Sequence, residues 1–345
     1  MTPAVATIRS ASLNGYVELA TLYGLDAVAM LRAQGLSPRM LAQPEAPISV
    51  AAARRLLEAS ARAAGVEHFG LRLAVRRRMS NLGPISIVLR AEPTARAALD
   101  TLCRYLKLLN ASLITRIEED GNLVVIREDL VVESGESVRQ SMELAVGVMA
   151  RILAELLGPT WRPRRVYFAH RAPRDLAEHH ALFGPVVTFN APFNGVVCAA
   201  GDLAAPLPPF DTGMAPFARA YLEQALSRQG GSAADSARAL IAALLPGGRC
   251  TAEQTAQHLA IDRRTLHRRL AAEDTSFSGL LAEARRDFAV RQLRDSDRPL
   301  AELAELLGFS GASAFAFWFR RQFGCTVSQW RARPDRAAVR PRKPR

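Results

Sequence analysis

The side chains best suited to chemistry in this sequence are cations that repeat along one short predicted helix, residues 262–270. Asp262 can cap its start, and Leu266 and Leu270 form an apolar side at helical spacing. The other side carries Arg263, Arg264, His267 and Arg268. Such a helix fits the major groove of B-DNA, where these groups can bond base edges and phosphates. A solvated arginine face, with His267 turned to solvent, would show the same pattern.

A shorter helix and a tight turn precede this cationic helix and can fix its direction. Thr251 suits the N-cap of the first helix, and Ala256 and Leu259 share one face at helical spacing. Ile261 fills the turn between the two helices. The order of helix, turn and basic helix is that of a helix-turn-helix unit, whose second helix enters the major groove.

A second predicted pair of helices, residues 299–324, repeats this arrangement nearer the C-terminus. Pro299 suits a helix start, and Gly308 suits the left-handed turn that ends the first helix. Ser310 is expected to cap the next helix, residues 310–323. One basic helix alone would favour a solvated surface, but two such units in one chain favour DNA binding.

Three phenylalanines, Phe315, Phe319 and Phe323, recur every four residues in the last of these helices. That spacing places them on one face. We therefore interpret them as core side chains and not as platforms for stacked bases.

A single helix over residues 277–295 is predicted to join the two units. At ~1.5 Å per residue its length is roughly 28 Å. Successive major-groove faces on one side of B-DNA lie ~34 Å apart. The two second helices are therefore expected to reach one face of a duplex.

Positive charge is concentrated toward the C-terminus of the 345-residue chain. The net charge is +12, and residues 236–345 hold 20 Lys/Arg and 11 Asp/Glu, against 25 and 22 in the other 235 residues. Such a basic region is the electrostatic footprint of a nucleic-acid-binding domain, although a generic basic surface would give the same count.

The first 205 residues show a mixed pattern in which helices predominate. Residues 113–118 and 123–128 flank a turn that contains Asp120-Gly121, which indicates a β-hairpin. A long amphipathic helix is predicted over residues 137–157. Shorter strands are predicted at residues 166–170, 186–189 and 196–199. The expected fold is an α+β domain, mostly helical with a small sheet.

Proline and glycine divide the chain into four expected regions. The first is residues 1–205. A linker region follows at residues 206–234, where prolines interrupt the pattern and one helix, residues 215–228, is predicted. The third is an all-α domain, residues 235–333, with the two helix-turn-helix units and their joining helix. Residues 334–345 are rich in arginine and proline and are expected to be a disordered basic tail.

Enzyme and metal chemistry find little support in the sequence. The first 205 residues contain no GxSxG, GxGxxG, P-loop or HExxH motif, so no catalytic residue or cofactor is predicted. The four cysteines are far apart, which argues against a zinc site and a disulfide framework. His170, His179 and His180 have no carboxylate or cysteine at a helpful spacing, so no metal site is predicted.

No targeting or membrane-spanning segment is predicted. The N-terminus lacks the charged and apolar stretches of a signal peptide. The most apolar long stretch, residues 142–157, contains three charged residues and is too short to span a bilayer. The sequence therefore predicts a cytoplasmic protein without a membrane partner.

The C-terminal motifs resemble the signature of AraC/XylS-type transcriptional regulators. They are LLGFS at 306–310, SAF at 313–315, FRRQFGCT at 319–326 and QWR at 329–331. RRTLHRRL at 263–270, followed by TSF at 275–277 and Arg285, resembles the first unit of that family. The resemblance covers about residues 236–333. It implies a sequence-specific regulator that binds double-stranded promoter DNA, with RNA polymerase as a partner and a homodimer as an open alternative.

The N-terminal part resembles the ornithine-utilisation-type branch of the same family. The motifs are NLGP at 81–84, EPT at 92–94, FGPVVTF at 183–189 and LAAPLP at 203–208. In that branch the domain is called arabinose-binding-like, which implies a sensory role but not arabinose as the ligand. A small-molecule effector of unknown identity is therefore expected, and no pocket residue is singled out.

The resemblance also implies which side chains face the bases. They are Arg264, His267 and Arg268 in the first unit and Ala312, Ser313, Ala316 and Phe317 in the second. Relatives usually carry a polar or basic residue where Phe317 stands, a small one where Trp318 stands and a proline where Val327 stands. Phe317 cannot form a bidentate guanine contact, so it either touches a thymine methyl group or packs against a neighbour. Arg320 and Arg321 are expected on phosphates.

Two other functions remain alternatives: an enzyme fused to a DNA-binding domain, and an architectural protein that binds DNA without sequence preference. The motif search speaks against the first. Selection from random duplexes would distinguish the second. The sequence does not separate activation from repression.

Overall fold

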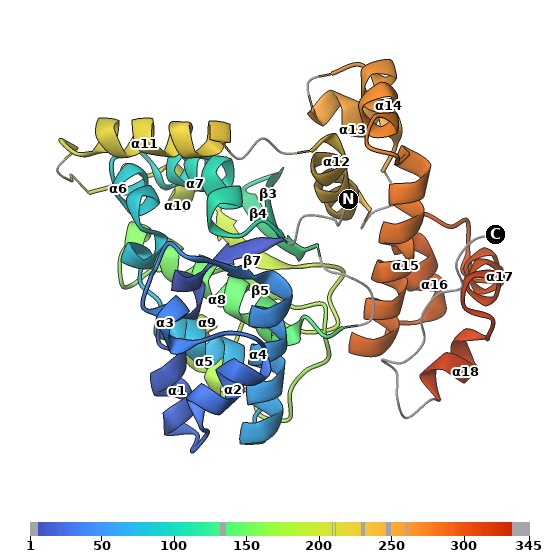
Figure 1. Cartoon of the computed structure of the whole chain (residues 1–345), viewed down its shortest axis with the longest axis horizontal. Helices are drawn as coiled ribbons and strands as arrows, with labels where there is room; N and C mark the ends of the chain where they lie inside the picture. The colour runs from blue at the N-terminus through green and yellow to red at the C-terminus, as the bar shows by residue number, and fades with distance from the viewer. Residues whose placement is uncertain are drawn as a thin grey trace.

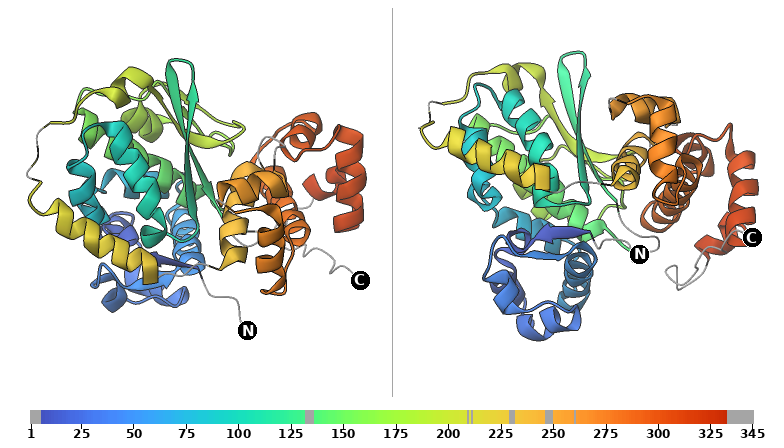
Figure 2. Two further views of the ribbon diagram at one scale, coloured as in Figure 1. Left: turned by 90° about the horizontal axis from the view of Figure 1, so that it is seen from above. Right: turned by 45° about the horizontal axis from the view of Figure 1, so that its top comes forward.

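The computed structural model of the chain describes residues 6–131, 136–208, 210, 212–228, 232–245, 250–259 and 261–332. Within these residues helices predominate, and strands form one sheet of two strands and one of five. The N-terminal and C-terminal parts form two lobes that lie side by side (Figure 1, Figure 2). The first lobe is mixed and the second is helical, as expected. The expected tail, residues 334–345, lies outside the described residues.

The first lobe begins with a helical layer around Tyr16, Leu56 and Phe69, whose side chains are fully buried. β1 (Thr7–Arg9) and β2 (Pro47–Ser49) pair antiparallel beside it. The layer consists of α1 (Tyr16–Leu22), α2 (Ala27–Ala33), α3 (Pro38–Leu41), α4 (Val50–Ala64) and α5 (Phe69–Val75), with the 3-10 turns η1 (Ser10–Leu13) and η2 (Met79–Leu82). Gly70 lets α5 approach the long helix α8 (Arg139–Leu157), because a Cβ there would lie 1.9 Å from the carbonyl oxygen of Gln140.

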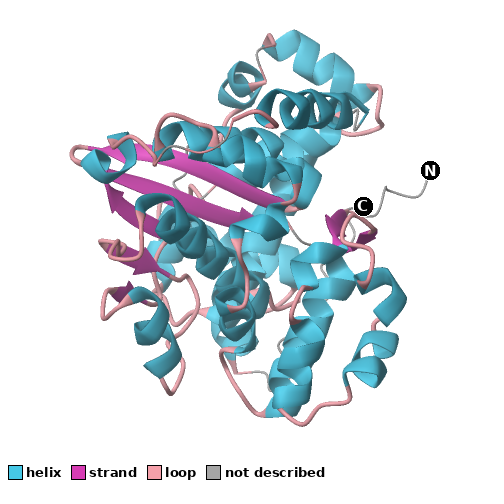
Figure 3. Cartoon of the chain, turned by 90° about the vertical axis from the view of Figure 1, so that its left-hand side faces the viewer, coloured by secondary structure: helices cyan, strands magenta, loops and turns pink. Residues whose placement is uncertain are grey.

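The larger sheet has the strand order β3-β4-β7-β5-β6 (Figure 3). β5 and β6 pair in parallel, and the other neighbours are antiparallel. The strands are β3 (Leu113–Asp120), β4 (Leu123–Leu130), β5 (Arg165–Tyr167), β6 (Val187–Thr188) and β7 (Asn194–Ala199). The predicted hairpin and the three short strands are confirmed, although β5 and β6 are shorter than expected.

Helices pack on this sheet and enclose a core that includes Tyr105, Ile126 and Leu153. Besides α8 they are α6 (Pro84–Arg90), α7 (Ala95–Leu109), α9 (Ala177–Phe183), α10 (Ala200–Ala204) and α11 (Ala215–Arg228). α11 lies in the expected linker region, yet it packs on α6 and α7 and buries Leu222 in this core. No helix in the described ranges is long and apolar enough to cross a membrane.

The second lobe has a hydrophobic core toward each end of one long helix. Its helices are α12 (Ala233–Leu244), α13 (Ala252–His258), α14 (Arg263–Ala271), α15 (Phe277–Asp295), α16 (Leu300–Leu306), α17 (Ala312–Phe323) and α18 (Val327–Arg331). α14 contributes Leu266 and Leu270 to the core at the N-terminal end of α15. α17 contributes Phe315, Phe319 and Phe323 to the core at the other end, which confirms the expected stripe.

Side-chain caps begin α13 and α14 as expected, but not α17. Thr251 and Asp262 accept backbone N–H groups of the first turns of α13 and α14. The expected cap at Ser310 is wrong: α17 begins at Ala312, with Gly311 at the N-cap and no side-chain hydrogen bond. Ser310 stands one residue before the N-cap, outside the position from which a hydroxyl caps the first turn.

Glu128 is a buried carboxyl group on an otherwise apolar strand face. Alternate residues of β4 are buried, and the others in this row are Val124, Ile126 and Leu130. Glu128 is 2% exposed. Burial, with a smaller contribution from Asp129, raises its pKa to about 8. The carboxyl group is therefore mostly protonated at neutral pH.

We expect Glu128→Gln to change how stability depends on pH. The pKa in the folded protein lies above the ordinary value of 4.5, so the folded state holds this proton more tightly than the unfolded chain. The resulting stability is full below pH ~4.5 and is lost as pH rises through about 8. The variant stays neutral, so its free energy of unfolding should exceed the wild-type value increasingly toward high pH, on the order of a few kcal/mol.

Urea unfolding at acidic and alkaline pH measures this difference. Asp120→Asn, at the exposed end of the same hairpin, is the control and should leave the pH profile unchanged. Parallel profiles for wild type and Glu128→Gln would show that folding does not raise the pKa of Glu128.

Candidate nucleic-acid interface

The polar face of α14 is exposed to solvent. Arg264, His267 and Arg268 are exposed, whereas Leu266 and Leu270 are fully buried. The N-cap keeps its charge, because hydrogen bonds from Thr265 hold the pKa of Asp262 below its ordinary value. Two guanidinium groups and an imidazole thus stand on a face that a major groove can accept.

Arg263 is held differently from its neighbours on α14. Its Nη1 lies 2.6 Å from Oε1 of Glu253 on α13, in an exposed ion pair between the two helices. Exposed pairs of this kind contribute little free energy. Arg263 can therefore leave Glu253 for another anion at small cost.

The outward face of α17 combines small, aromatic and basic side chains. Phe317 is 73% exposed, so it does not pack into the core of the free protein. The other predicted contact residues on or before this helix are exposed or half-buried: Ser310, Ala312, Ser313, Ala316, Arg320 and Arg321. A flat aromatic ring in this position offers apolar contact and no hydrogen bond.

Trp318 belongs to the core and not to this face. Its ring lies against those of Phe309, Phe315 and Phe323, with centroid distances of 5.2, 5.9 and 6.2 Å. The indole thus packs against side chains of α17 and of the turn before it. Val327 is likewise buried, at the first position of α18.

Helix α15 fixes the spacing of α14 and α17. It has 19 residues and is roughly 28 Å long. Figure 1 shows α14 near one end of α15 and α17 beside its other half. Leu281 and Ala284 pack against both hydrophobic cores, so the two helix pairs are joined through one continuous apolar contact.

The first lobe holds the C-terminal end of α15 through Arg171. Its backbone N–H donates to the carbonyl oxygen of Asp295 at 2.8 Å, and its guanidinium donates to those of Arg294 and Ser296 at 3.0 and 3.2 Å. Its Nε also lies 2.6 Å from Oδ2 of Asp297. A helix end leaves its last carbonyl groups without partners inside the helix. Arg171 therefore caps α15 from the other lobe, and we call this contact the Arg171 cap.

Two arginines of α15 reach back to the first lobe. Arg291 Nη1 donates to the carbonyl oxygen of Leu130 at 2.7 Å, and Arg294 Nη2 donates to that of Glu136 at 2.7 Å. The carboxylate of Glu136 pairs with Arg54, a buried residue of α4. Residue 136 therefore links the helical layer of the first lobe to α15.

A buried ionisable cluster lies next to the Arg171 cap in sequence. Oε1 of Glu143 on α8 lies 3.4 Å from Nε2 of both His170 and His179, and all three side chains are buried. Burial alone would raise the pKa of Glu143, but the two histidines and Arg139 hold it below its ordinary value. Sequence spacing missed this carboxylate because α8 brings it from a distant segment. Within the described ranges no three His, Cys, Asp or Glu groups are placed to hold a metal ion.

Comparison with known proteins assigns both lobes. Residues 24–207 match the family described as the arabinose-binding domain of AraC transcription regulators, and residues 255–333 match a helix-turn-helix domain family. These matches define a DNA-binding transcriptional regulator with a ligand-sensing N-terminal domain, and not an enzyme. The chain belongs to the AraC family of transcription regulators. We call the first lobe the sensory domain and the second the DNA-binding domain.

Similar proteins span nearly the whole chain. The HTH-type transcriptional regulator VirS of Mycobacterium tuberculosis is 32% identical over 327 residues, which are 94% of this chain and 96% of VirS. The ornithine utilization regulator of Pseudomonas aeruginosa is 25% identical over 324 residues, 92% of this chain and 94% of that protein. The crystal structure of the transcriptional regulator CdpR from Pseudomonas aeruginosa covers 92% of this chain and 98% of that chain, with 20% identity and a TM-score of 0.44.

We expect Arg171→Ala to loosen the end of α15 without unfolding either lobe. The substitution removes the side-chain bonds to residues 294, 296 and 297. Hydrogen–deuterium exchange of the full chain should then speed up for peptides that cover residues 292–298.

Arg174→Ala is the matched control, because Arg174 is an exposed arginine of the same loop. It should leave exchange of that segment at the wild-type rate. Equal exchange in both variants would show that the Arg171 cap does not hold α15.

Proposed function

We propose that α14 and α17 enter successive major grooves on one face of promoter DNA, with α15 as the spacer between them. The pairs α13–α14 and α16–α17 then act as two helix-turn-helix units of one domain, within residues 235–333. The observation that carries this proposal is the division of α14 into a buried apolar face and an exposed cationic face. The length of α15 supports it, because roughly 28 Å approaches the ~34 Å between groove faces.

The proposed contacts differ between the two helices. Arg264 and Arg268 read bases, since a guanidinium group can bond guanine in a bidentate way, and His267 lies beside them. On α17, Phe317 contacts a thymine methyl group. The small side chains of Ala312, Ser313 and Ala316 let the helix approach the base edges closely. Phosphate contacts come from Arg263, Ser310, Arg320 and Arg321.

The sensory domain controls DNA binding in this proposal by acting on α15. A ligand shifts an equilibrium only when it binds one arrangement of the protein better than another. The Arg171 cap supports α15 as the responding element, because it joins that helix to the sensory domain. RNA polymerase as a partner and a homodimer stay predictions.

Arg268→Ala should reduce both affinity and sequence preference. Selection from random duplexes should first yield an asymmetric motif in two parts, about one helical turn apart. Loss of the Arg268 contact should then cost about 1–3 kcal/mol at the selected site and relax preference in one half only. Fluorescence anisotropy at fixed salt, on selected and scrambled duplexes, measures both effects.

Arg269→Ala is the charge-matched control for this variant. Helical spacing turns position 269 to the flank of α14, away from Arg264. It should weaken binding to selected and scrambled duplexes alike, because it removes only non-specific attraction. A selection without any motif would instead favour an architectural DNA-binding protein.

Phe317 should make the protein sensitive to a single methyl group of the DNA. Replacing the contacted thymine by uracil removes the methyl group and should cost the wild type about 0.8 kcal/mol. Phe317→Ala should bind both duplexes equally. A scan of single thymine-to-uracil changes along the site locates the position, and a uracil penalty that persists in Phe317→Ala would remove Phe317 from the interface.

A further inference from the structure

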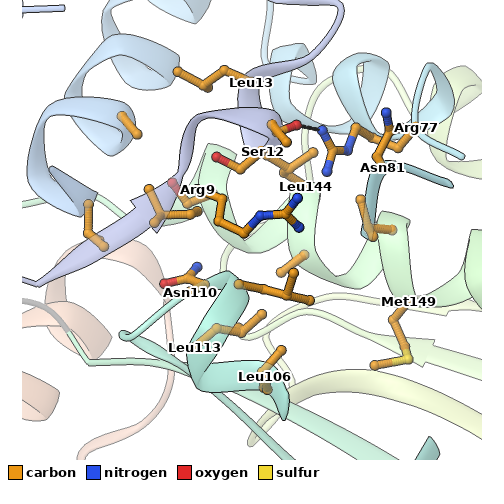
Figure 4. Close-up of a pocket in the computed structure, with 18 of the residues that line it drawn as sticks. Arg9, Ser12, Leu13, Arg77, Asn81, Leu106, Asn110, Leu113, Leu144 and Met149 are labelled. Carbon is orange, nitrogen blue, oxygen red and sulfur yellow. Dashed lines mark hydrogen bonds between the residues drawn. The ribbon is translucent and has the colours of Figure 1, made fainter. Parts of the chain in front are cut away.

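The sensory domain contains a cavity of about 130 Å³ (Figure 4). It lies where β1, η1, α4, α7 and α8 meet, and most of its wall is aliphatic. Leu57, Leu106, Leu144, Val148, Met149 and Ile152 form much of this wall. A cavity of ~150 Å³ with such walls accommodates benzene. This one can therefore hold an apolar body of about six carbons.

Arg77 brings an uncompensated cation to the wall of this cavity. Its side chain is 7% exposed, and its Nη1 donates to the carbonyl oxygen of Ala11. Its Nε has no hydrogen-bond partner, and among the described residues no carboxylate pairs with its guanidinium. Burial lowers the pKa of Arg77 to about 10, with a smaller contribution from nearby Arg9. A buried cation is costly unless an anion accompanies it.

Arg9 adds a second guanidinium group at the same end. Figure 4 shows Arg9 and Arg77 reaching the cavity from different elements, with Asn81 and Ser12 nearby. Arg9 pairs with Glu45 and donates to the carbonyl oxygen of Leu82 at 3.1 Å. Glu45 thus pairs with Arg9 but not with Arg77, and this end keeps a surplus of positive charge beside an apolar wall.

We propose that this cavity is the effector site and that it takes a small organic carboxylate with an apolar body of about six carbons, of the benzoate or hexanoate kind. The carboxylate accepts hydrogen bonds from Arg77 and Arg9, and the body lies against Leu106 and Met149. Glu128 also lines the cavity, and its protonated form does not repel an anion. The inference rests on the ligand-sensing role of this domain and adds the chemical class of the ligand.

Arg54 connects the same cavity to the DNA-binding domain. It lines the cavity, pairs with Glu136 and donates to the carbonyl oxygen of Ser137 at 3.0 Å. The carbonyl oxygen of Glu136 accepts the bond from Arg294 of α15. An anion in the cavity attracts the Arg54 guanidinium away from Glu136. Ligand binding therefore alters the contact between Glu136 and the C-terminal end of α15.

The test uses the full chain and a panel of matched small molecules. Benzoate and hexanoate are compared with the neutral amides of the same shape, benzamide and hexanamide, and with the cation benzylamine. Isothermal titration and thermal shift measure binding. We expect the carboxylates to bind and raise the melting temperature, and the amides and the amine to give no saturable signal.

Two variants locate the site. Arg77→Gln should weaken carboxylate binding at least about tenfold, because it removes a charge-assisted hydrogen bond. Val148→Phe fills the apolar part and should abolish binding while leaving Arg77 in place. Both variants should bind the selected DNA as tightly as ligand-free wild type, which also shows that they fold.

The possible results separate this inference from the regulator function. Amides that bind as well as carboxylates, amine binding without carboxylate binding, or no binding by any member of the panel would each overturn the carboxylate site. Carboxylate binding that persists in both variants would place the binding site outside this cavity. DNA binding by wild type is measured in the same preparations, and its loss would instead count against the proposed function.

Discussion

The sharing of α15 by two hydrophobic cores is the constraint on which the DNA-binding domain depends. Each helix pair is too small to bury a sufficient core alone. Phe277 and Leu280 close one core, and Phe288 and Leu293 close the other. Because α15 is continuous, the positions of α14 and α17 are tied to one another. Any force on α15 therefore reaches both α14 and α17 through one continuous helix.

The sensory domain contacts α15 mainly through polar groups at the end of the helix. Arg171, Arg291 and Arg294 form hydrogen bonds with backbone carbonyl groups across the boundary of the two lobes. Such an interface resembles the polar contacts of domains that move relative to one another more than it resembles a hydrophobic core. Its bonds can be exchanged for bonds to water at small net cost, which suits a contact that a ligand must alter.

The buried ionisable groups of the sensory domain differ in how their charge is compensated. Glu143 pairs with Arg139 of the same helix and lies 3.4 Å from Nε2 of both His170 and His179. Arg77 has no such balance, and Glu128 avoids the cost of burial by staying protonated. Sequences that fold well violate the rule of paired buried charges mainly where function requires it. Arg77 and Glu128 both line the cavity, whereas Glu143 does not.

Local patterns in the sequence determined most of the elements. Helical and alternating periodicity located the hairpin, α8, α14, α15 and the core stripe of α17, because each depends on residues within a few positions of one another. The same locality gave the caps at Thr251 and Asp262. The expected cap failed at Ser310, because α17 begins at Ala312 and Gly311 occupies its N-cap position.

Only the tertiary structure decided which distant residues meet. The Arg171 cap, the Glu143 cluster and the cavity around Arg77 each join segments that are far apart in the chain, and no period in the sequence marks such a meeting. The motif identified both Phe317 and Trp318 as departures from the family. Only the structure shows that Phe317 is exposed and that Trp318 packs against the core. Sequence encodes these contacts only through the packing of whole elements, and that packing is settled when the chain folds.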